Sequence, residues 1–179
     1  MATTYSFVCG KLILSFGLTL LLMKQKPKAR IYIDTSVAGG YFDKEFSTAT
    51  KQFFKEANKG KMTLLISSLL ENELTDAPAK VRKLISNLNK KNSEPVKHTQ
   101  QAESLAEKYI EAKVVGKTSV EDCRHIALAT VCKADVLVSW NFKHIVNVER
   151  INGYNSVNLK HGYTTIDIRT PAEVLHYES

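Results

Sequence analysis

Short runs of apolar residues alternate along this chain with longer segments in which apolar residues recur every three or four positions. The short runs predict β-strands at 31–33, 63–67 and 135–139, with a weaker pattern at 165–168. The longer segments predict helices over 48–58, 69–74, 79–89, 100–114 and 120–133. Strands that alternate with helices predict an α/β fold built on a mostly parallel sheet.

The polar segment 90–95 follows neither period, so we interpret it as a loop between two helices. No internal repeat or low-complexity linker interrupts the pattern. A chain of 179 residues suits a single domain, because a chain of this length buries about two thirds of the surface that it exposes when unfolded.

An apolar segment precedes the alternating pattern. Residues 12–23 carry no charge, but they are fewer than the roughly 20 residues that a helix needs to cross a bilayer. The basic residues that follow, between positions 24 and 30, would keep the downstream domain on the cytoplasmic side if the segment inserted. We divide the chain into an apolar and basic extension, residues 1–29, and a domain at 30–179. A start of translation at Met23 is favoured over a weak membrane anchor, and we expect a cytoplasmic protein.

The chain is basic. Lys and Arg number 25 against 18 Asp and Glu, which gives a net charge of +7. Such a charge favours a polyanionic partner such as nucleic acid, although ordinary soluble proteins also reach it. The three cysteines indicate a reducing compartment, because Cys123 and Cys132 would lie roughly 13 Å apart in one helix, beyond disulfide reach. No Cys or His pair has the spacing of zinc ligands.

Four polar residues stand where predicted strands end or predicted helices begin: Asp34, Glu73, Asp122 and Asn141. The carboxyl ends of parallel strands share one edge of a sheet, and the helices that carry Glu73 and Asp122 begin at this edge. Neighbouring carboxylates raise one another's pKa unless a cation neutralises them. Oxygen ligands select Mg²⁺ or Mn²⁺ over zinc. We therefore expect a site for one of these metals.

Each acid also has a purely structural explanation. In this explanation Asp34 would close a turn after a strand, Glu73 would be a solvated helix residue, and Asp122 would form a capping box with Ser119. The joint placement of the acids favours the metal site over three separate explanations. Asp135 begins its strand, so it lies at the opposite edge and we interpret it as structural.

Other enzyme classes fit the residues less well. A phosphatase of the haloacid dehalogenase type requires a second Asp where Ser36 stands. The pair Gly39 and Gly40 belongs to neither a phosphate-binding loop nor a dinucleotide-binding motif, and the chain has no Gly-x-Ser-x-Gly elbow. Trp140 and Phe142 are interpreted as core residues in preference to base-stacking platforms.

Four segments together resemble the four acidic motifs of PIN domains in order and spacing. They are Ile-Tyr-Ile-Asp34-Thr-Ser36, Ile66-Ser-Ser-Leu-Leu-Glu-Asn-Glu73-Leu, Asp122-Cys-Arg-His125-Ile-Ala-Leu-Ala129 and Asp135-Val-Leu-Val-Ser139-Trp-Asn141-Phe142. The resemblance spans about residues 30–147. It implies a three-layer α/β/α fold and a metal-dependent nuclease, and a chain of this size is similar to the VapC-type toxins of type II toxin–antitoxin systems.

This resemblance implies that the chain hydrolyses RNA phosphodiester bonds with Mg²⁺ or Mn²⁺, with RNA and a cognate antitoxin as partners and a homodimer as one option. It places the catalytic and metal-binding positions at Asp34, Glu73, Asp122 and Asn141. Ser36 and Ser139 match small hydroxyl positions that orient ligands or a phosphate. Four residues that flank the site in sequence could steer the RNA backbone or simply form a solvated surface: Arg124, His125, Lys143 and His144.

The chain departs from the family pattern at Asn141, where the fourth acid is expected. An amide keeps an oxygen ligand but loses a charge, so it would hold a second metal more weakly or only through water. This departure leaves a second interpretation open, in which the chain is a catalytically weak PIN-like module that binds RNA or a protein partner.

Overall fold

The structure is a computed structural model in which residues 27–176 are described. It contains a five-stranded sheet in the order β3-β2-β1-β4-β5, and every pair of neighbouring strands is parallel. The strands are β1 (Ala29–Ile33), β2 (Met62–Ser67), β3 (Ser93–Val96), β4 (Val136–Val138) and β5 (Asp167–Arg169). The four strands expected from the sequence all form, and the α/β fold with a parallel sheet is confirmed.

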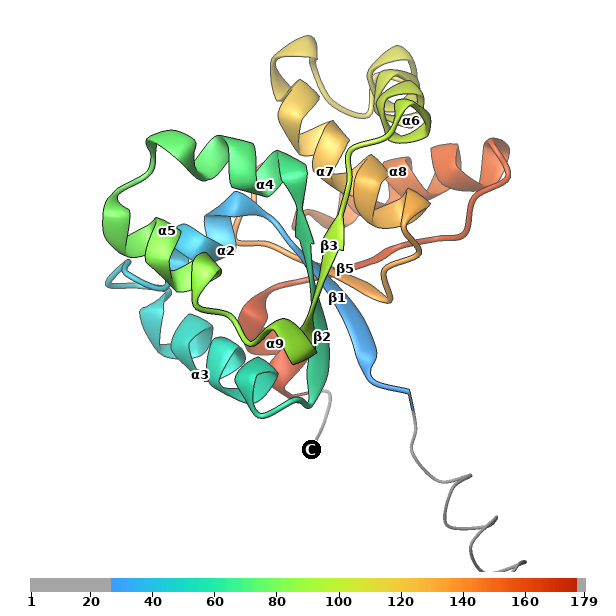
Figure 1. The fold of residues 1–179 in the computed structure, drawn as a ribbon. Helices are drawn as coiled ribbons and strands as arrows, with labels where there is room; N and C mark the ends of the chain where they lie inside the picture. The colour runs from blue at the N-terminus through green and yellow to red at the C-terminus, as the bar shows by residue number, and fades with distance from the viewer. Residues whose placement is uncertain (1–26, 177–179) are drawn as a thin grey trace, which may run out of the picture.

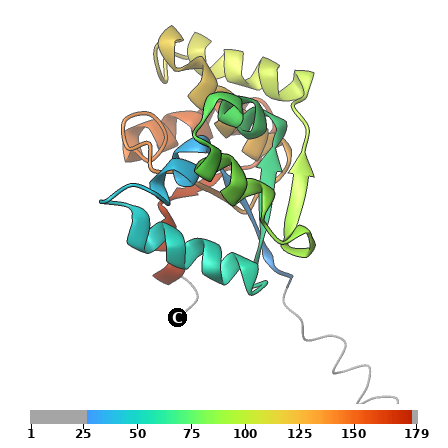
Figure 2. The same ribbon diagram turned by 60° about the vertical axis from the view of Figure 1, so that its left-hand side comes forward.

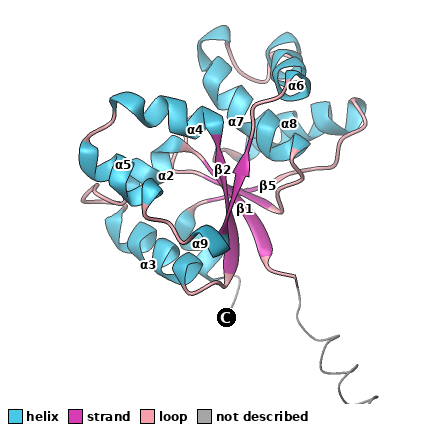
Figure 3. Ribbon diagram, in the orientation of Figure 1, coloured by secondary structure: helices cyan, strands magenta, loops and turns pink. Residues whose placement is uncertain are grey.

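Helices cover both faces of the sheet (Figures 1 and 3). One face carries α2 (Thr35–Gly40), α3 (Ser47–Asn58), α5 (Ala79–Ser86) and α9 (Pro171–His176). The other face carries α6 (Gln100–Glu111), α7 (Val120–Val131) and α8 (Val148–Lys160). Helix α4 (Ser68–Glu73) leaves the end of β2, and the 3₁₀ turns are η1 (Leu74–Asp76), η2 (Lys90–Asn92) and η3 (Lys117–Ser119). These layers give the expected three-layer architecture.

Alternate residues of the strands build two apolar cores. Tyr32 of β1 belongs to the core beneath α6, α7 and α8, whereas its neighbours Ile31 and Ile33 belong to the core beneath α2, α3 and α5. Successive side chains of a strand point to opposite faces, and a parallel sheet covered on both faces buries both sets. The continuous apolar run of β1 therefore indicates its place at the centre of the sheet.

The chain leaves β1 and β4 toward opposite faces of the sheet. After β1 it forms α2 and α3 on one face before β2, and after β4 it forms α8 on the other face before β5. Figure 2 shows the same fold from a second direction. Ligands of open α/β sheets bind where neighbouring strands diverge in this way, beyond their carboxyl ends. The ends of β1 and β4 are thus the place to examine for a site.

The interpretation of residues 90–95 as a loop is wrong. The segment forms η2 and most of β3, in which Ser93, Glu94 and Pro95 pair with residues of β2. Proline cannot donate a ladder hydrogen bond, but an edge strand needs its donors only on one side. Strand β3 is the outermost strand of the sheet, so Pro95 is tolerated there.

Three predicted helices extend too far. The helix expected over 100–114 ends at Glu111, and the one expected over 120–133 ends at Val131. Lys113 and Lys133 follow these helices with φ of 57° and 56°, in the left-handed region that commonly terminates a helix. The predicted helix over 79–89 likewise ends early, at Ser86. Helices α2, α8 and α9 have no counterpart among the predicted elements.

Most of the expected N-terminal extension lies outside the described residues, so the division at residue 29 stays a prediction. Within residues 27–176 no helix is both long enough and apolar enough to cross a membrane. Cys123 and Cys132 are free thiols, whereas Cys9 is not among the described residues.

Candidate functional site

Asp34 lies directly after β1 and is 4% exposed. Its carboxylate accepts hydrogen bonds from Ser36 Oγ at 2.6 Å and Ser139 Oγ at 2.7 Å, and from the backbone N–H of Val37 at 3.3 Å. The last bond makes Asp34 the N-cap of α2, so the expected structural role is present. Burial raises the pKa of Asp34, against the lowering effects of His125 and of these hydrogen bonds. A buried carboxylate with a raised pKa is therefore held at the diverging strand ends.

Asp122 lies in the first turn of α7 and is partly buried. Burial raises the pKa of this carboxyl, and the negative charge of Asp34 raises it further. Ser119 makes no side-chain capping bond at the start of α7, so the capping-box explanation of Asp122 is not supported. The carboxylate Oδ1 instead accepts a hydrogen bond at 2.8 Å from the amide of Asn141. Asp34 and Asp122 thus share one electrostatic environment.

Asn141 follows β4 and presents its NH₂ group to Asp122. Its Oδ1 accepts a hydrogen bond at 3.1 Å from the backbone N–H of His144, and this bond fixes which end of the amide is the oxygen. Its own backbone N–H donates to Ser139 Oγ at 2.9 Å. A carboxylate at this position would repel Asp122, whereas the amide donates to it. The departure from four acids is therefore accommodated by a hydrogen bond inside the site.

Glu73 ends α4 and belongs to a second group of bonds. Its Oε2 accepts from Thr35 Oγ1 and from Nε2 of the buried His125, the latter at 3.0 Å. Burial alone would raise the pKa of Glu73, but the hydrogen bond and charge of His125, together with Thr35, lower it below its usual value. On its other side, the His125 ring lies 2.8 Å from the hydroxyl of Tyr32, which donates to Ser67 Oγ. Ser67 on β2, Tyr32 on β1 and His125 on α7 therefore form a chain of contacts that ends at Glu73.

The hydroxyls of Ser36 and Ser139 hold the Asp34 carboxylate by hydrogen bonds. Ser36 Oγ also accepts the backbone N–H of Trp140 at 2.8 Å, so both serines tie the loop after β4 to the carboxylate. Thr35, Tyr32 and Ser67 were not among the expected site residues. Thr35 stands between two expected residues, and this position was the one available signal for it. Nothing in the local pattern distinguished Tyr32 from a core residue.

Among the flanking residues expected to steer the RNA backbone, Arg124 is engaged in ion pairs, whereas Lys143 is exposed. Arg124 forms ion pairs with Glu103 at 2.6 Å and with Glu121 at 2.5 Å, and these join α6 to α7. Lys143 is exposed beside the site. The core interpretation holds for Trp140, which packs against the apolar core beneath α2, α3 and α5. It is wrong for Phe142, which is 49% exposed.

The donor chemistry at Asp34 and Asp122 fits a hard divalent cation. Both are oxygen ligands, and a cation would reverse the burial and mutual repulsion that raise their pKa values. Across residues 27–176, however, no three His, Cys, Asp or Glu side chains lie close enough together, as arranged, to hold one metal ion. Asp34, Asp122 and Asn141 are linked through Ser139, whereas Glu73 is bonded to His125. The expected four residues thus gather in two groups at one edge of the sheet.

Comparisons with known proteins add little to this picture. No family model matches the chain, and no curated protein is significantly similar to it in sequence. Eight chains in solved structures match. One belongs to a crystal structure of VapBC2 from Rickettsia felis bound to a DNA fragment from the promoter, with 13% identity and a TM-score of 0.49, covering 79% of this chain and 98% of that one. A likeness at this level carries no argument about activity, which has to rest on the residues of the site.

Proposed function

We propose that this protein is a metal-dependent endoribonuclease that hydrolyses RNA phosphodiester bonds, and that it acts as the toxin of a type II toxin–antitoxin system. The observation that carries the enzymatic part is the buried carboxylate of Asp34 together with the partly buried carboxylate of Asp122, near the point where β1 and β4 diverge. Both have raised pKa values, so the folded protein is destabilised by their ionisation unless a cation neutralises them. Acids whose pKa is raised by burial and by a neighbouring charge at such a position are characteristic of functional sites.

The roles of the residues follow from their contacts. Asp34 and Asp122 hold Mg²⁺ or Mn²⁺, and Ser36 and Ser139 keep the Asp34 carboxylate oriented. Glu73, fixed by His125 and Thr35, accepts a proton or a hydrogen bond from water at the edge of the site. When bound, the cation supplies an activated water and offsets charge on the phosphate.

Asn141 supports a second candidate function. Its amide already donates to Asp122, and it adds no negative charge to the site. A site with one acid fewer binds cations more weakly, which favours a module that binds RNA or a protein without efficient cleavage. RNA cleavage in the presence of metal distinguishes the two candidates.

The partners follow from charge and from the motif resemblance. A net charge of +7 suits RNA as the ligand. An antitoxin as protein partner, a homodimer and a cytoplasmic location rest on the resemblance to VapC-type toxins.

Calorimetric titration with Mn²⁺ tests the proposed site directly. Asp34→Asn should abolish the binding heat that the unmodified protein gives. Asp135→Asn is the matched control, because Asp135 is also beside the sheet but lies at the opposite edge, where it accepts the backbone N–H of Arg30. Equal Mn²⁺ affinity in the unmodified protein and in Asp34→Asn would show that Asp34 holds no metal, and the proposal would fail.

A further inference from the structure

Three aromatic side chains pack together beside the carboxylates. Phe46 stacks on Trp140 with ring centroids 4.5 Å apart and an angle of 24° between the planes. Phe142 lies 6.0 Å from the Trp140 ring and 6.2 Å from the Phe46 ring. We call these three residues the aromatic platform. Phe142 is 49% exposed, so the platform has an apolar surface that residues 27–176 do not cover.

The Trp140 ring of the platform is fixed in place. The indole N–H of Trp140 donates to Thr50 Oγ1 at 2.9 Å. A Cβ atom added at Gly40 would come within 2.7 Å of the indole, so the ring occupies space that only glycine leaves free. The backbone of Phe46 is fixed by two hydrogen bonds. Asp43 Oδ1 accepts its N–H at 3.4 Å, and Thr50 Oγ1 donates to its carbonyl. Rigid rings lose little entropy when another flat group stacks on them.

The platform is connected to the carboxylates by short bonds. The backbone N–H of Trp140 donates to Ser36 Oγ, which itself donates to Asp34. Phe142 directly follows Asn141, whose amide donates to Asp122. Consecutive Cα atoms are about 3.8 Å apart, so Phe142 is adjacent in the chain to a residue of the site. The platform is therefore connected to both carboxylates, to Asp34 through Ser36 and to Asp122 through the residue that precedes Phe142.

The next residue completes the arrangement. Lys143 is exposed and supplies a positive charge immediately beside Phe142. Single-stranded nucleic acid is bound by this combination, in which aromatic rings stack on unpaired bases and cations follow the phosphates. A paired duplex keeps its bases stacked on one another and offers no free face to a protruding ring.

We infer that the aromatic platform stacks an unpaired base of the RNA next to the phosphate at the carboxylates, with Phe142 as the contact residue and Lys143 as the phosphate contact. The inference rests on the proposed function for the nature of the ligand. It makes the substrate a single-stranded segment, and it makes Phe142 a substrate-positioning residue. The platform selects RNA whose bases are unpaired, so a duplex of the same sequence is a poor ligand.

The chain contains a single tryptophan, and it lies inside the platform. Its fluorescence therefore reports on stacking without any need for catalysis. The test is a titration in EDTA with a single-stranded RNA dodecamer, a blunt duplex of the same sequence, and an abasic oligonucleotide of equal length and charge. The single strand should quench Trp140 and bind more tightly than the other two.

Phe142→Leu removes the ring and keeps an apolar side chain. It should weaken single-strand binding by roughly 5- to 150-fold, the range for loss of one stacked base. Phe142→Tyr should restore most of the affinity. Leu159→Ala is the matched control, because Leu159 is an exposed apolar residue on α8, outside the platform. It should bind like the unmodified protein.

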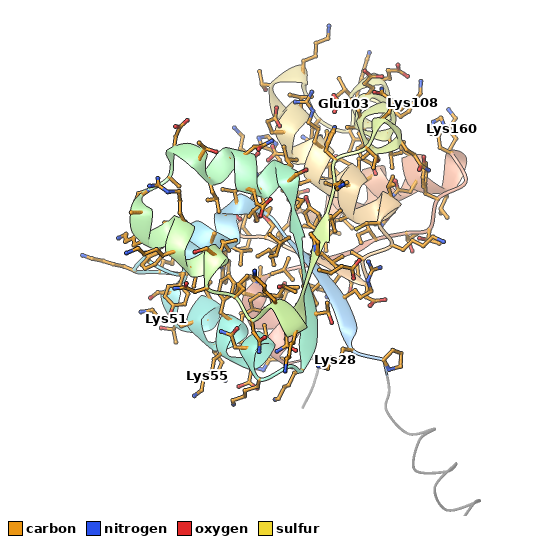
Figure 4. The ribbon with its side chains drawn as sticks, in the orientation of Figure 1. Lys28, Lys51, Lys55, Glu103, Lys108 and Lys160 are labelled. Carbon is orange, nitrogen blue, oxygen red and sulfur yellow. The ribbon has the colours of Figure 1, made fainter. Side chains whose placement is uncertain are left out.

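Lys143→Gln should lower the salt dependence of binding by about one counterion, whereas Phe142→Leu should leave that dependence unchanged. Lys160→Gln is the control for charge, because Figure 4 shows Lys160 extending outward from α8. Equal salt dependence in Lys143→Gln and Lys160→Gln would overturn the assignment of Lys143.

The outcomes separate this inference from the proposed function. Equal binding of the abasic and the single-stranded oligonucleotide, or unchanged affinity in Phe142→Leu, overturns the platform even if Asp34-dependent cleavage is observed. Base-dependent quenching without cleavage supports the platform and contradicts the nuclease. Absence of binding to all three oligonucleotides overturns the inference, and leaves the exposed ring as a surface for a protein partner.

Discussion

The two edges of the sheet hold their carboxylates in different ways. At the amino-terminal edge, the Arg30 guanidinium donates to both oxygens of Glu94, at 3.2 and 2.7 Å, and to the Cys132 carbonyl at 2.8 Å. At the carboxyl-terminal edge, Asp34 is bonded by the uncharged hydroxyls of Ser36 and Ser139. The first edge pairs a partly exposed carboxylate with a cation, whereas the second buries a carboxylate among neutral donors.

This difference indicates which acids are structural. The guanidinium of Arg30 neutralises Glu94, and the hydrogen bond with Glu94 raises the pKa of Arg30. Asp34 gains hydrogen bonds but no equivalent neutralisation, and burial raises its pKa. Keeping such a carboxylate ionised lowers the stability of the fold, and acids in such an environment are characteristic of functional sites.

The largest effect is expected on cleavage. Asp34→Asn and Asp122→Asn should each lower RNA cleavage by more than about 100-fold, since even the outer partners of metal ligands are worth roughly 10- to 100-fold. Asp135→Asn at the other edge should cleave normally. A fluorescent-RNA assay at limiting Mn²⁺ measures these rates, and equal loss in all three variants would remove the distinction between the edges.

A charge added at Asn141 sharpens the comparison. Asn141→Asp should tighten Mn²⁺ binding by about tenfold, because it adds an anionic ligand beside Asp122. Without metal it should lower the melting temperature, because two carboxylates then repel each other. Asn152→Asp adds the same charge on the exposed side of α8 and should change neither quantity. Calorimetry and thermal denaturation measure both, and an unchanged Mn²⁺ affinity would place Asn141 outside the metal site.

Arg30 provides the reverse experiment at the other edge. Arg30→Met should lower the free energy of unfolding by about 1 kcal/mol, a value limited by the partial exposure of the Arg30–Glu94 pair. Mn²⁺ affinity should stay the same. Urea denaturation and calorimetry measure the two effects, and a loss of metal binding in this variant would show that the edges are coupled.

The smallest effect is expected on stability as a function of pH. The pKa of Asp34 is higher in the folded than in the unfolded state, so its stabilising contribution is complete below the unfolded pKa and is lost as pH rises through the folded pKa. Asp34→Asn removes this loss and should be more stable than the unmodified protein near neutral pH without metal. Urea denaturation between about pH 4 and 8 tests the sign. A variant that is less stable at neutral pH would show that the capping bonds of Asp34 outweigh its burial.

Sequence patterns located the elements that depend on local order. The apolar run before Asp34 indicated a central strand, because a strand buried on both faces has no polar alternation. The same pattern missed β3. Proline is acceptable only in an outermost strand, and the sequence does not say which strand is outermost. It also placed Phe142 in the core, because an aromatic residue beside a buried strand resembles a core residue until its neighbours are known.

The sequence by itself determined the order along the chain of four of the five described strands, all but β3, and the positions of the acids at strand and helix ends. Tertiary structure alone decided the partners of those acids. Asn141 donates to Asp122 across 19 residues, His125 bonds Glu73 across 52, and Ser139 bonds Asp34 across 105. The spacing of apolar residues shows which side of a helix or strand is buried. The bonds between the acids and their partners depend instead on how the crossovers bring distant strand ends together.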